Sequence, residues 1–212
     1  AFAGAILVTV AVYLIGSRGR GGTSPVRLTL AGVGMGAVVS GIVSAITLLV
    51  PTAFDSARSW NAGSVAGRPL GVVLGIVPFI VIGLLIAIVV SRDLNAVGLG
   101  DDLARSLGTR ILRTRILVIV AVTLLAGAAT AAAGPITFVG LMIPHAARFV
   151  VGADQRWILA LTCFLAPILL LVADIVGRVA LSPAELPVGI VTAFVGAPVL
   201  IVLARRLKGG AA

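Results

Sequence analysis

Long apolar runs alternate with short polar segments along the whole chain. The seven runs are Ala1–Gly16, Leu28–Val50, Leu70–Val90, Ile116–Ala133, Pro135–Val151, Trp157–Val176 and Val188–Ala204. About 20 apolar residues are enough to cross a bilayer as a helix, and inside lipid each segment must satisfy its own backbone hydrogen bonds. The pattern therefore predicts an all-α integral membrane protein, a polytopic helical bundle of about seven transmembrane helices.

Composition supports a membrane protein over a soluble one. The chain has 212 residues, of which 60% are hydrophobic and 11% are charged, whereas soluble domains carry roughly a quarter charged residues. A secretory signal would be one short apolar run, but here the runs recur throughout. The sequence opens without methionine inside an apolar run, so we expect a fragment whose N-terminal part is missing.

The basic residues indicate how the chain crosses the membrane. A net charge of +9 would suggest nucleic acid as the partner of a soluble protein, but here the arginines cluster at the ends of apolar runs. With seven spans, thirteen of the sixteen basic residues share one side; if Pro135–Val151 did not cross, the split would be nine against seven. Because positive charge concentrates in the cytoplasm, we expect seven spans, a cytoplasmic C-terminus and no nucleic-acid partner.

Groups that could carry chemistry are scarce. Lys208 is the only lysine, so the sequence has no phosphate-binding loop of the GxxxxGK[ST] type. His145 is the only histidine, which excludes a site built from several histidines. We therefore predict that the chain is not an enzyme, binds no metal or other cofactor, and has no ATPase site of its own.

One acidic residue, Asp174, lies within an apolar run. It precedes Arg178 by four residues, so the two side chains share a helix face and can pair. An ion pair at the membrane interface is one interpretation. A coupling-ion site and a contact for an external partner are the alternatives, because acids inside membranes often mark ion pathways.

The polar segment 91–115 is long and patterned. We expect Asp101 to cap a short helix and Gly108 to end it. Leu103 and Leu107 then share one face and form an apolar stripe outside the membrane. This stripe either folds back on the helix ends of this chain or docks a separate cytoplasmic subunit.

The loop between Pro51 and Pro69 contains Trp60 followed by small residues. It is consistent with an interfacial turn or a short re-entrant helix near the mouth of a pathway.

Several motifs at consistent spacing run through nearly the whole chain. They are Trp60-x-x-Gly63-Ser64-x-x-Gly67, Leu94-Asn95, Ala104-x-x-Leu107-Gly108, Gly134-Pro135-Ile136-x-Phe138-Val139-Gly140-Leu141-x-x-Pro144-His145-x-x-Arg148, Val151-Gly152-x-Asp154, Ala173-Asp174, Arg178 and Pro183-Ala184-Glu185-Leu186-Pro187-Val188-Gly189-x-Val191-Thr192-Ala193-x-x-Gly196-Ala197-Pro198. By these motifs the chain resembles the FecCD-type permeases. These are the membrane subunits of ATP-binding-cassette (ABC) importers for iron–siderophore complexes, haem and vitamin B12.

The resemblance implies one permease domain over residues 1–212, with an ATPase-coupling loop at 91–115. It implies a ten-helix subunit, of which about the first three helices would be missing here. Such permeases pair with an identical or related permease in the membrane lipid. Two cytoplasmic ATPase subunits, which use ATP and Mg²⁺, dock on one side, and an extracytoplasmic substrate-binding protein docks on the other.

The resemblance also implies roles for individual residues. The ATPase-coupling loop would consist of Gly100, Asp101, Asp102, Leu103, Ala104, Leu107 and Gly108. Contacts to the binding protein would come from Arg178, Arg58 and Arg68. The translocation pathway and its gate would include Gly36, Ser40, Trp60, Gly63, Ser64 and Gly67.

The function expected from the resemblance is import of a ferric siderophore across the bacterial cytoplasmic membrane by a multi-pass permease. Vitamin B12 and haem are alternative cargoes within the family. Outside it, an ion-coupled secondary transporter would make Asp174 essential, and a membrane scaffold would bind a partner without moving a substrate.

Overall fold

The computed structural model describes residues 2–17, 25–180 and 185–208. These residues form nine α-helices and their connections. The helices are α1 (Phe2–Ser17), α2 (Pro25–Leu49), α3 (Pro51–Asn61), α4 (Leu70–Val97), α5 (Asp101–Ser106), α6 (Ile111–Ala133), α7 (Val139–Val151), α8 (Gln155–Ala180) and α9 (Val188–Lys208). Residues Pro183 and Ala184 of the last motif lie outside the described part of the chain.

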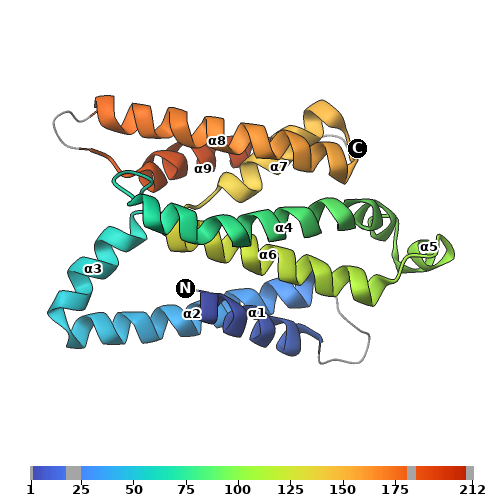
Figure 1. Ribbon diagram of the computed structural model, residues 1–212, viewed down its shortest axis with the longest axis horizontal. Helices are drawn as coiled ribbons and strands as arrows, with labels where there is room; N and C mark the ends of the chain where they lie inside the picture. The colour runs from blue at the N-terminus through green and yellow to red at the C-terminus, as the bar shows by residue number, and fades with distance from the viewer. Residues whose placement is uncertain (1, 18–24, 181–184, 209–212) are drawn as a thin grey trace.

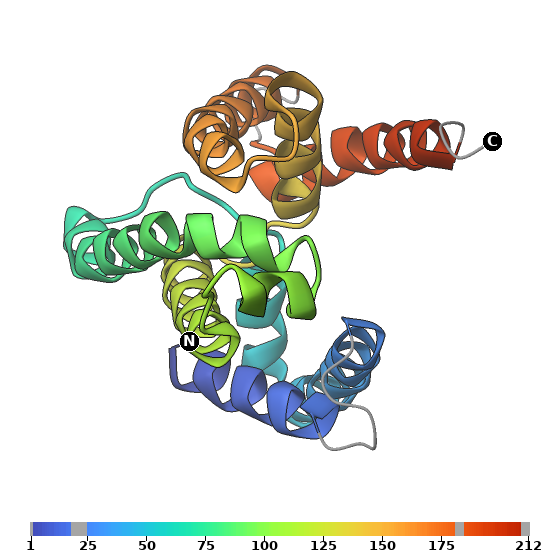
Figure 2. The same cartoon turned by 90° about the vertical axis from the view of Figure 1, so that its right-hand side faces the viewer.

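The helices are arranged around a central antiparallel pair, α4 and α6 (Figure 1). Helices α1 and α2 pack on one side of this pair and α7, α8 and α9 on the other, an arrangement that is also visible end-on in Figure 2. Gly83 allows the central helices to approach closely, because a Cβ atom at this position would lie 2.8 Å from Leu125 Cγ. Small residues commonly permit such contacts between membrane helices.

Each of the seven apolar runs lies at least in part in a helix. Helices α2, α4, α6 and α8 are long and apolar enough to cross a membrane, whereas α1, α7 and the first part of α9 are shorter apolar helices. The all-α membrane class is therefore confirmed, and the number of seven crossings stays a prediction.

The fifth run differs from the expected continuous helix. Its helical part, α7, begins only at Val139 and has 13 residues, which is about 20 Å of helix against a hydrocarbon core of about 30 Å. Phe138 has a φ of 69° and Gly134 a φ of 75°. These left-handed backbone positions interrupt the helix at both ends of the Pro135 segment.

The connection between α4 and α6 is shorter than the predicted loop at 91–115. Helix α4 continues to Val97 and α6 begins at Ile111, so the connection, including α5, covers residues 98–110. The polar residues in the helix ends have partners there, since Thr114 Oγ1 donates a hydrogen bond to Asp93 Oδ2 at 3.0 Å. These partners allow the helices to extend beyond their apolar runs.

The loop from Pro51 to Pro69 contains an 11-residue helix, α3. A helix is therefore present here, and the turn follows it at Gly63 and Gly67, which both have positive φ.

Helix α2 is largely uncovered by the rest of this chain. A Cβ atom on Gly32, Gly34, Gly36 or Gly41 would meet nothing within 4 Å. These four glycines of α2 therefore make no close helix contact inside this chain.

Candidate functional site

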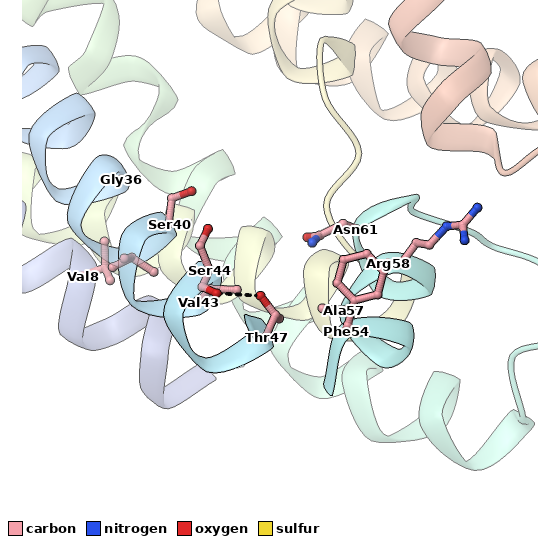
Figure 3. Close-up of a pocket in the computed structure, with 11 residues that line it drawn as sticks. Val8, Gly36, Ser40, Val43, Ser44, Thr47, Phe54, Ala57, Arg58 and Asn61 are labelled. Carbon is pink, nitrogen blue, oxygen red and sulfur yellow. Dashed lines mark hydrogen bonds between the residues drawn. The ribbon is translucent and has the colours of Figure 1, made fainter. Parts of the chain in front are cut away.

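A cavity of about 610 Å³ lies between α1, α2 and α3 (Figure 3). Its lining residues are Val8, Gly36, Val39, Ser40, Val43, Ser44, Thr47, Phe54, Ala57, Arg58 and Asn61. It thus contains Gly36 and Ser40, the two α2 residues predicted for the pathway, and it also contains Arg58.

The polar part of this cavity is a row of hydroxyls on α2. Ser40, Ser44 and Thr47 follow one another at helical spacing, so they lie on one face. Thr47 Oγ1 donates to Ser44 O at 2.9 Å, and Asn61 adds an amide from the end of α3. Valines on α1 and α2 surround these groups, so the cavity combines a few uncharged polar groups with an apolar lining.

Arg58 was predicted to contact the binding protein. It is exposed and lines the cavity, and its guanidinium extends away from the α2 hydroxyls (Figure 3). Arg68, predicted for the same role, is also exposed, and its guanidinium donates to Ser64 O at 3.2 Å and 3.1 Å.

Trp60 lies outside the α2 cavity. It lines a neighbouring cavity of about 530 Å³ with residues of α1 and α6. Val8 of α1 lines both cavities. Trp60 is 40% exposed, so its indole is accessible beside the predicted pathway rather than within the cavity.

Gly63 belongs to a close backbone contact that we call the glycine junction, formed by Gly63, Gly134 and Gly189. A Cβ atom on Gly63 would lie 2.6 Å from Pro135 O, and one on Gly134 would lie 2.6 Å from Trp60 O. The Gly189 amide donates to Gly63 O at 3.1 Å. The junction therefore holds three distant segments together through their backbones.

Ser64 and Gly67 complete the loop after the junction. The Ser64 amide donates to Ala133 O at 2.8 Å, and its hydroxyl accepts from the Ala66 amide at 3.2 Å. A Cβ atom on Gly67 would have open space, but its φ of 65° favours glycine. The roles of these residues in gating stay predictions, and their visible role is to shape the turn.

Helix α5, which the resemblance assigns to ATPase coupling, begins differently from the prediction. Gly100, with a φ of 107°, is the N-cap, and it makes no side-chain capping bond. Asp101 is instead the first helical residue, and its carboxylate accepts from Arg115 Nη2 at 2.9 Å. The prediction of an Asp101 cap is therefore wrong, because the carboxylate is used to attach α5 to the start of α6.

The other end of α5 follows the prediction for Gly108. The Gly108 amide donates to Arg105 O and the Thr109 amide to Ala104 O, each at 2.9 Å, while Gly108 has a φ of 81°. This pair of bonds with a left-handed glycine is a Schellman motif. It ends the helix sharply.

Leu103 in α5 and Leu107, the C-cap of this helix, are both uncovered. Leu103 is 57% exposed and Leu107 is 66% exposed, whereas Ala104 between them is fully buried. The interpretation that the stripe folds back on this chain is therefore wrong. Asp102 is exposed too, and its pair with Arg105 at 3.5 Å stays on the surface of α5.

A link between α4 and α8 was not predicted. Asn95 Nδ2 donates to Asp154 Oδ1 at 2.7 Å, and the Gln155 amide donates to Asn95 Oδ1 at 2.8 Å. The bond from Asn95, followed by the bond from the Arg156 amide, lowers the pKa of Asp154. Both Asn95 and Asp154 belong to the motifs above, but nothing in one sequence pairs residues 59 positions apart.

The predicted pairing of Asp174 with Arg178 on α8 is confirmed, whereas its place at the membrane interface stays a prediction. Arg178 Nε lies 2.8 Å from Asp174 Oδ2, and Arg178 Nη1 lies 3.3 Å from Glu185 Oε1. Arg178 is about half exposed. Its charge is already shared between two carboxylates, and contact with a binding protein stays a prediction.

Comparison with known proteins agrees with the resemblance seen in the motifs. The model of the FecCD transport family matches residues 1–206. The chain belongs to the FecCD transport family. The resemblance to FecCD permeases is thereby confirmed.

Two relatives in the FecCD family show the range of similarity. The chain is 50% identical to the ferric enterobactin transport system permease protein FepD of Escherichia coli (strain K12), covering 100% of this chain and 63% of FepD. It is 40% identical to the probable siderophore transport system permease protein YfiZ of Bacillus subtilis (strain 168), covering 97% of this chain and 62% of YfiZ. The chain thus spans less than two thirds of these relatives.

A solved structure shares the fold. It is described as an inward-facing conformation of a "putative metal-chelate type ABC transporter". The similarity has a TM-score of 0.82 and 29% identity, over 97% of this chain and 64% of the other. The helical arrangement of this FecCD chain is therefore that of an ABC transporter membrane subunit.

Proposed function

We propose that this chain is part of the permease of an ABC importer that moves ferric siderophores across the bacterial cytoplasmic membrane. The observation that carries the proposal is the 50% identity, over the whole chain, to a ferric enterobactin permease. Haem and vitamin B12 importers belong to the same expected group, but the relatives quoted above are named for siderophore transport.

The proposed partners follow from the uncovered surfaces. Two ATPase subunits, which bind ATP and Mg²⁺, dock on the exposed leucines of α5. A second permease subunit, identical or related, completes the pathway beside α2. The substrate-binding protein contacts the opposite end of the bundle, where Arg178 lies. The C-terminus then lies in the cytoplasm with α5, in agreement with the distribution of basic residues.

The proposed mechanism is a two-state movement without chemistry on the substrate. ATP binding shifts the equilibrium only through contacts that differ between the two states. Movement of α5 reaches α6 through the Asp101–Arg115 pair. It reaches α8 through α4, because α4 contacts α5 and Asn95 bonds to Asp154.

The substrate pathway proposed here passes the α2 cavity. Weak contacts to the hydroxyls of Ser40, Ser44 and Thr47 suit a chelate that must leave as easily as it enters. Selection of the cargo then rests chiefly with the binding protein.

The test uses the full-length permease with its ATPase subunits in proteoliposomes, with the substrate-binding protein present. Leu103→Asp or Leu107→Asp places a charge on the docking stripe, and we expect uptake of labelled ferric enterobactin to fall at least roughly tenfold, the size of a lost hot-spot contact. ATP hydrolysis should continue without uptake. Leu103→Met keeps the apolar surface and should transport at close to the normal rate.

Two results would contradict the proposal. Normal uptake by Leu103→Asp, at equal protein content in the membrane, would remove α5 as the coupling element. Uptake that survives without ATP, stops with an uncoupler and requires Asp174 would instead identify an ion-coupled carrier.

A further inference from the structure

A second groove lies between α4 and α8, near the end of the bundle that carries α5. Its volume is about 340 Å³, within the range of small-molecule sites. It is lined by Leu84, Ile88, Ser91, Arg92, Arg156, Leu159, Ala160 and Cys163. The proposed transport cycle assigns no role to these residues.

The lining residues are ordered along the axes of α4 and α8. On α4, Leu84, Ile88 and Arg92 follow at intervals of four residues, and on α8 the order from Arg156 to Cys163 runs in the opposite direction along the bundle. Arg92 and Arg156 therefore mark one end of the groove. From Arg92 to Leu84 the helix rises about 12 Å, so the apolar lining extends about this far from the two arginines.

The two arginines are available to a ligand. Both are exposed, and the ion pairs found among the described residues involve neither guanidinium. Asp154, the neighbouring acid, already accepts hydrogen bonds from Asn95 and the Arg156 amide through Oδ1. The Ser91 hydroxyl donates to Ile88 O at 2.6 Å, so the polar contacts left for a ligand are cationic.

We infer that this groove binds one anionic phospholipid. The headgroup phosphate lies between Arg92 and Arg156, and an acyl chain follows Leu84, Ile88 and Leu159 into the bilayer. Basic pockets between membrane helices near the interface suit anionic lipid headgroups. Trp157, next to Arg156 and 64% exposed, is of the type that lies at the headgroup level.

The positive charge of the two arginines favours an anionic lipid over an apolar helix as the occupant of this groove. A further hydrophobic helix seated in the groove would cover its apolar lining but leave two guanidinium groups unpaired at its rim, which is costly where water is scarce. A phosphate provides a partner for both. A zwitterionic lipid adds its own cation beside the arginines, so binding should prefer phosphatidylglycerol over phosphatidylcholine.

The first test is native mass spectrometry of the purified full-length permease titrated with phosphatidylglycerol or phosphatidylcholine. Because each basic residue near the surface contributes roughly fivefold in affinity for anionic lipid, Arg92→Gln with Arg156→Gln should weaken phosphatidylglycerol binding on the order of 30-fold. The control, Arg110→Gln with Arg113→Gln, removes the same charge from exposed positions outside the groove. Equal losses in both double variants would overturn the inference.

The second test locates the lipid. A phosphatidylglycerol with a photoreactive diazirine in its acyl chain should cross-link to peptides containing Leu84–Ile88 or Leu159–Cys163, and these cross-links should be lost in the Arg92 and Arg156 double variant. Cross-links only on other helices would show that protein covers the groove. Neither test requires transport, so a wrong proposal for the cargo would leave these results unchanged.

Discussion

The contact at Gly134 allows a prediction with a calculable size. In Gly134→Ala the new residue must adopt a φ of 75° and a ψ of −175°, a region that is almost restricted to glycine and costs about 1–3 kcal/mol. Its Cβ atom must also fit 2.6 Å from Trp60 O, and overpacking of this kind costs about 1–3 kcal/mol. Together we expect a loss of about 2–6 kcal/mol in the free energy of unfolding.

Two matched variants separate these contributions. Gly67→Ala has a positive φ but open space around its Cβ atom, so it should lose only about 1–2 kcal/mol, the cost of the left-handed backbone. Gly75→Ala lies within α4 with nothing within 4 Å and should be neutral or gain up to about 1 kcal/mol from helix propensity.

The assay is unfolding of the full-length permease by sodium dodecyl sulfate in mixed micelles, followed by circular dichroism. From the most to the least stable variant, the expected order is Gly75→Ala, Gly67→Ala and Gly134→Ala. If Gly134→Ala were as stable as Gly67→Ala, the structure would accommodate the new Cβ atom beside Trp60 O without a loss in the free energy of unfolding. The glycine junction would then not be a tight backbone contact.

Two further predictions concern charged groups near the ends of α8. Because the pKa of Asp154 is lowered in the folded protein, its contribution to stability is present above its ordinary value and is lost as the pH falls through the lowered one. Asp154→Asn should therefore lose less stability than the unchanged protein on acidification from pH about 5 to 3, measured by the same unfolding titration. Arg178→Ala should hardly change stability, because exposed ion pairs contribute little, but should weaken binding of the substrate-loaded binding protein in surface plasmon resonance. Glu185→Gln removes one of the two carboxylates that share the Arg178 charge and should strengthen this binding. No change in binding in either variant would remove Arg178 from the docking surface.

Most of the fold could be predicted because lipid leaves a chain few choices. An apolar run inside a bilayer must form a helix, and the seven runs lead to α1, α2, α4, α6, α7, α8 and α9. The start of α7 could not be predicted, since it depends on the left-handed backbone at Phe138, a conformation that residues other than glycine rarely adopt. The extension of α4 to Val97 was also missed, because its polar residues are satisfied by partners on α6 and α8.

The parts of the candidate site that depend on residues close in sequence could be predicted. Gly100 and Gly108 delimit α5, and the spacing of Leu103 and Leu107 placed both on its uncovered face. The role of Asp101 was missed because an acid at a helix start suits both a cap and an ion pair, and Arg115 decides between them. The grouping of Arg58 with Ser40 depends on how α3 folds back after α2.

The length of helix α4 determines how far one of its ends moves when the helix tilts. Its 28 residues make a rod about 42 Å long, joined to α6 along the close contact at Gly83. Asn95 fixes one end of the rod to the start of α8, and the other end leads through Pro69 to the turn of the glycine junction. A tilt of about 5° would therefore move the far end by roughly 4 Å, which is about the width of a side chain.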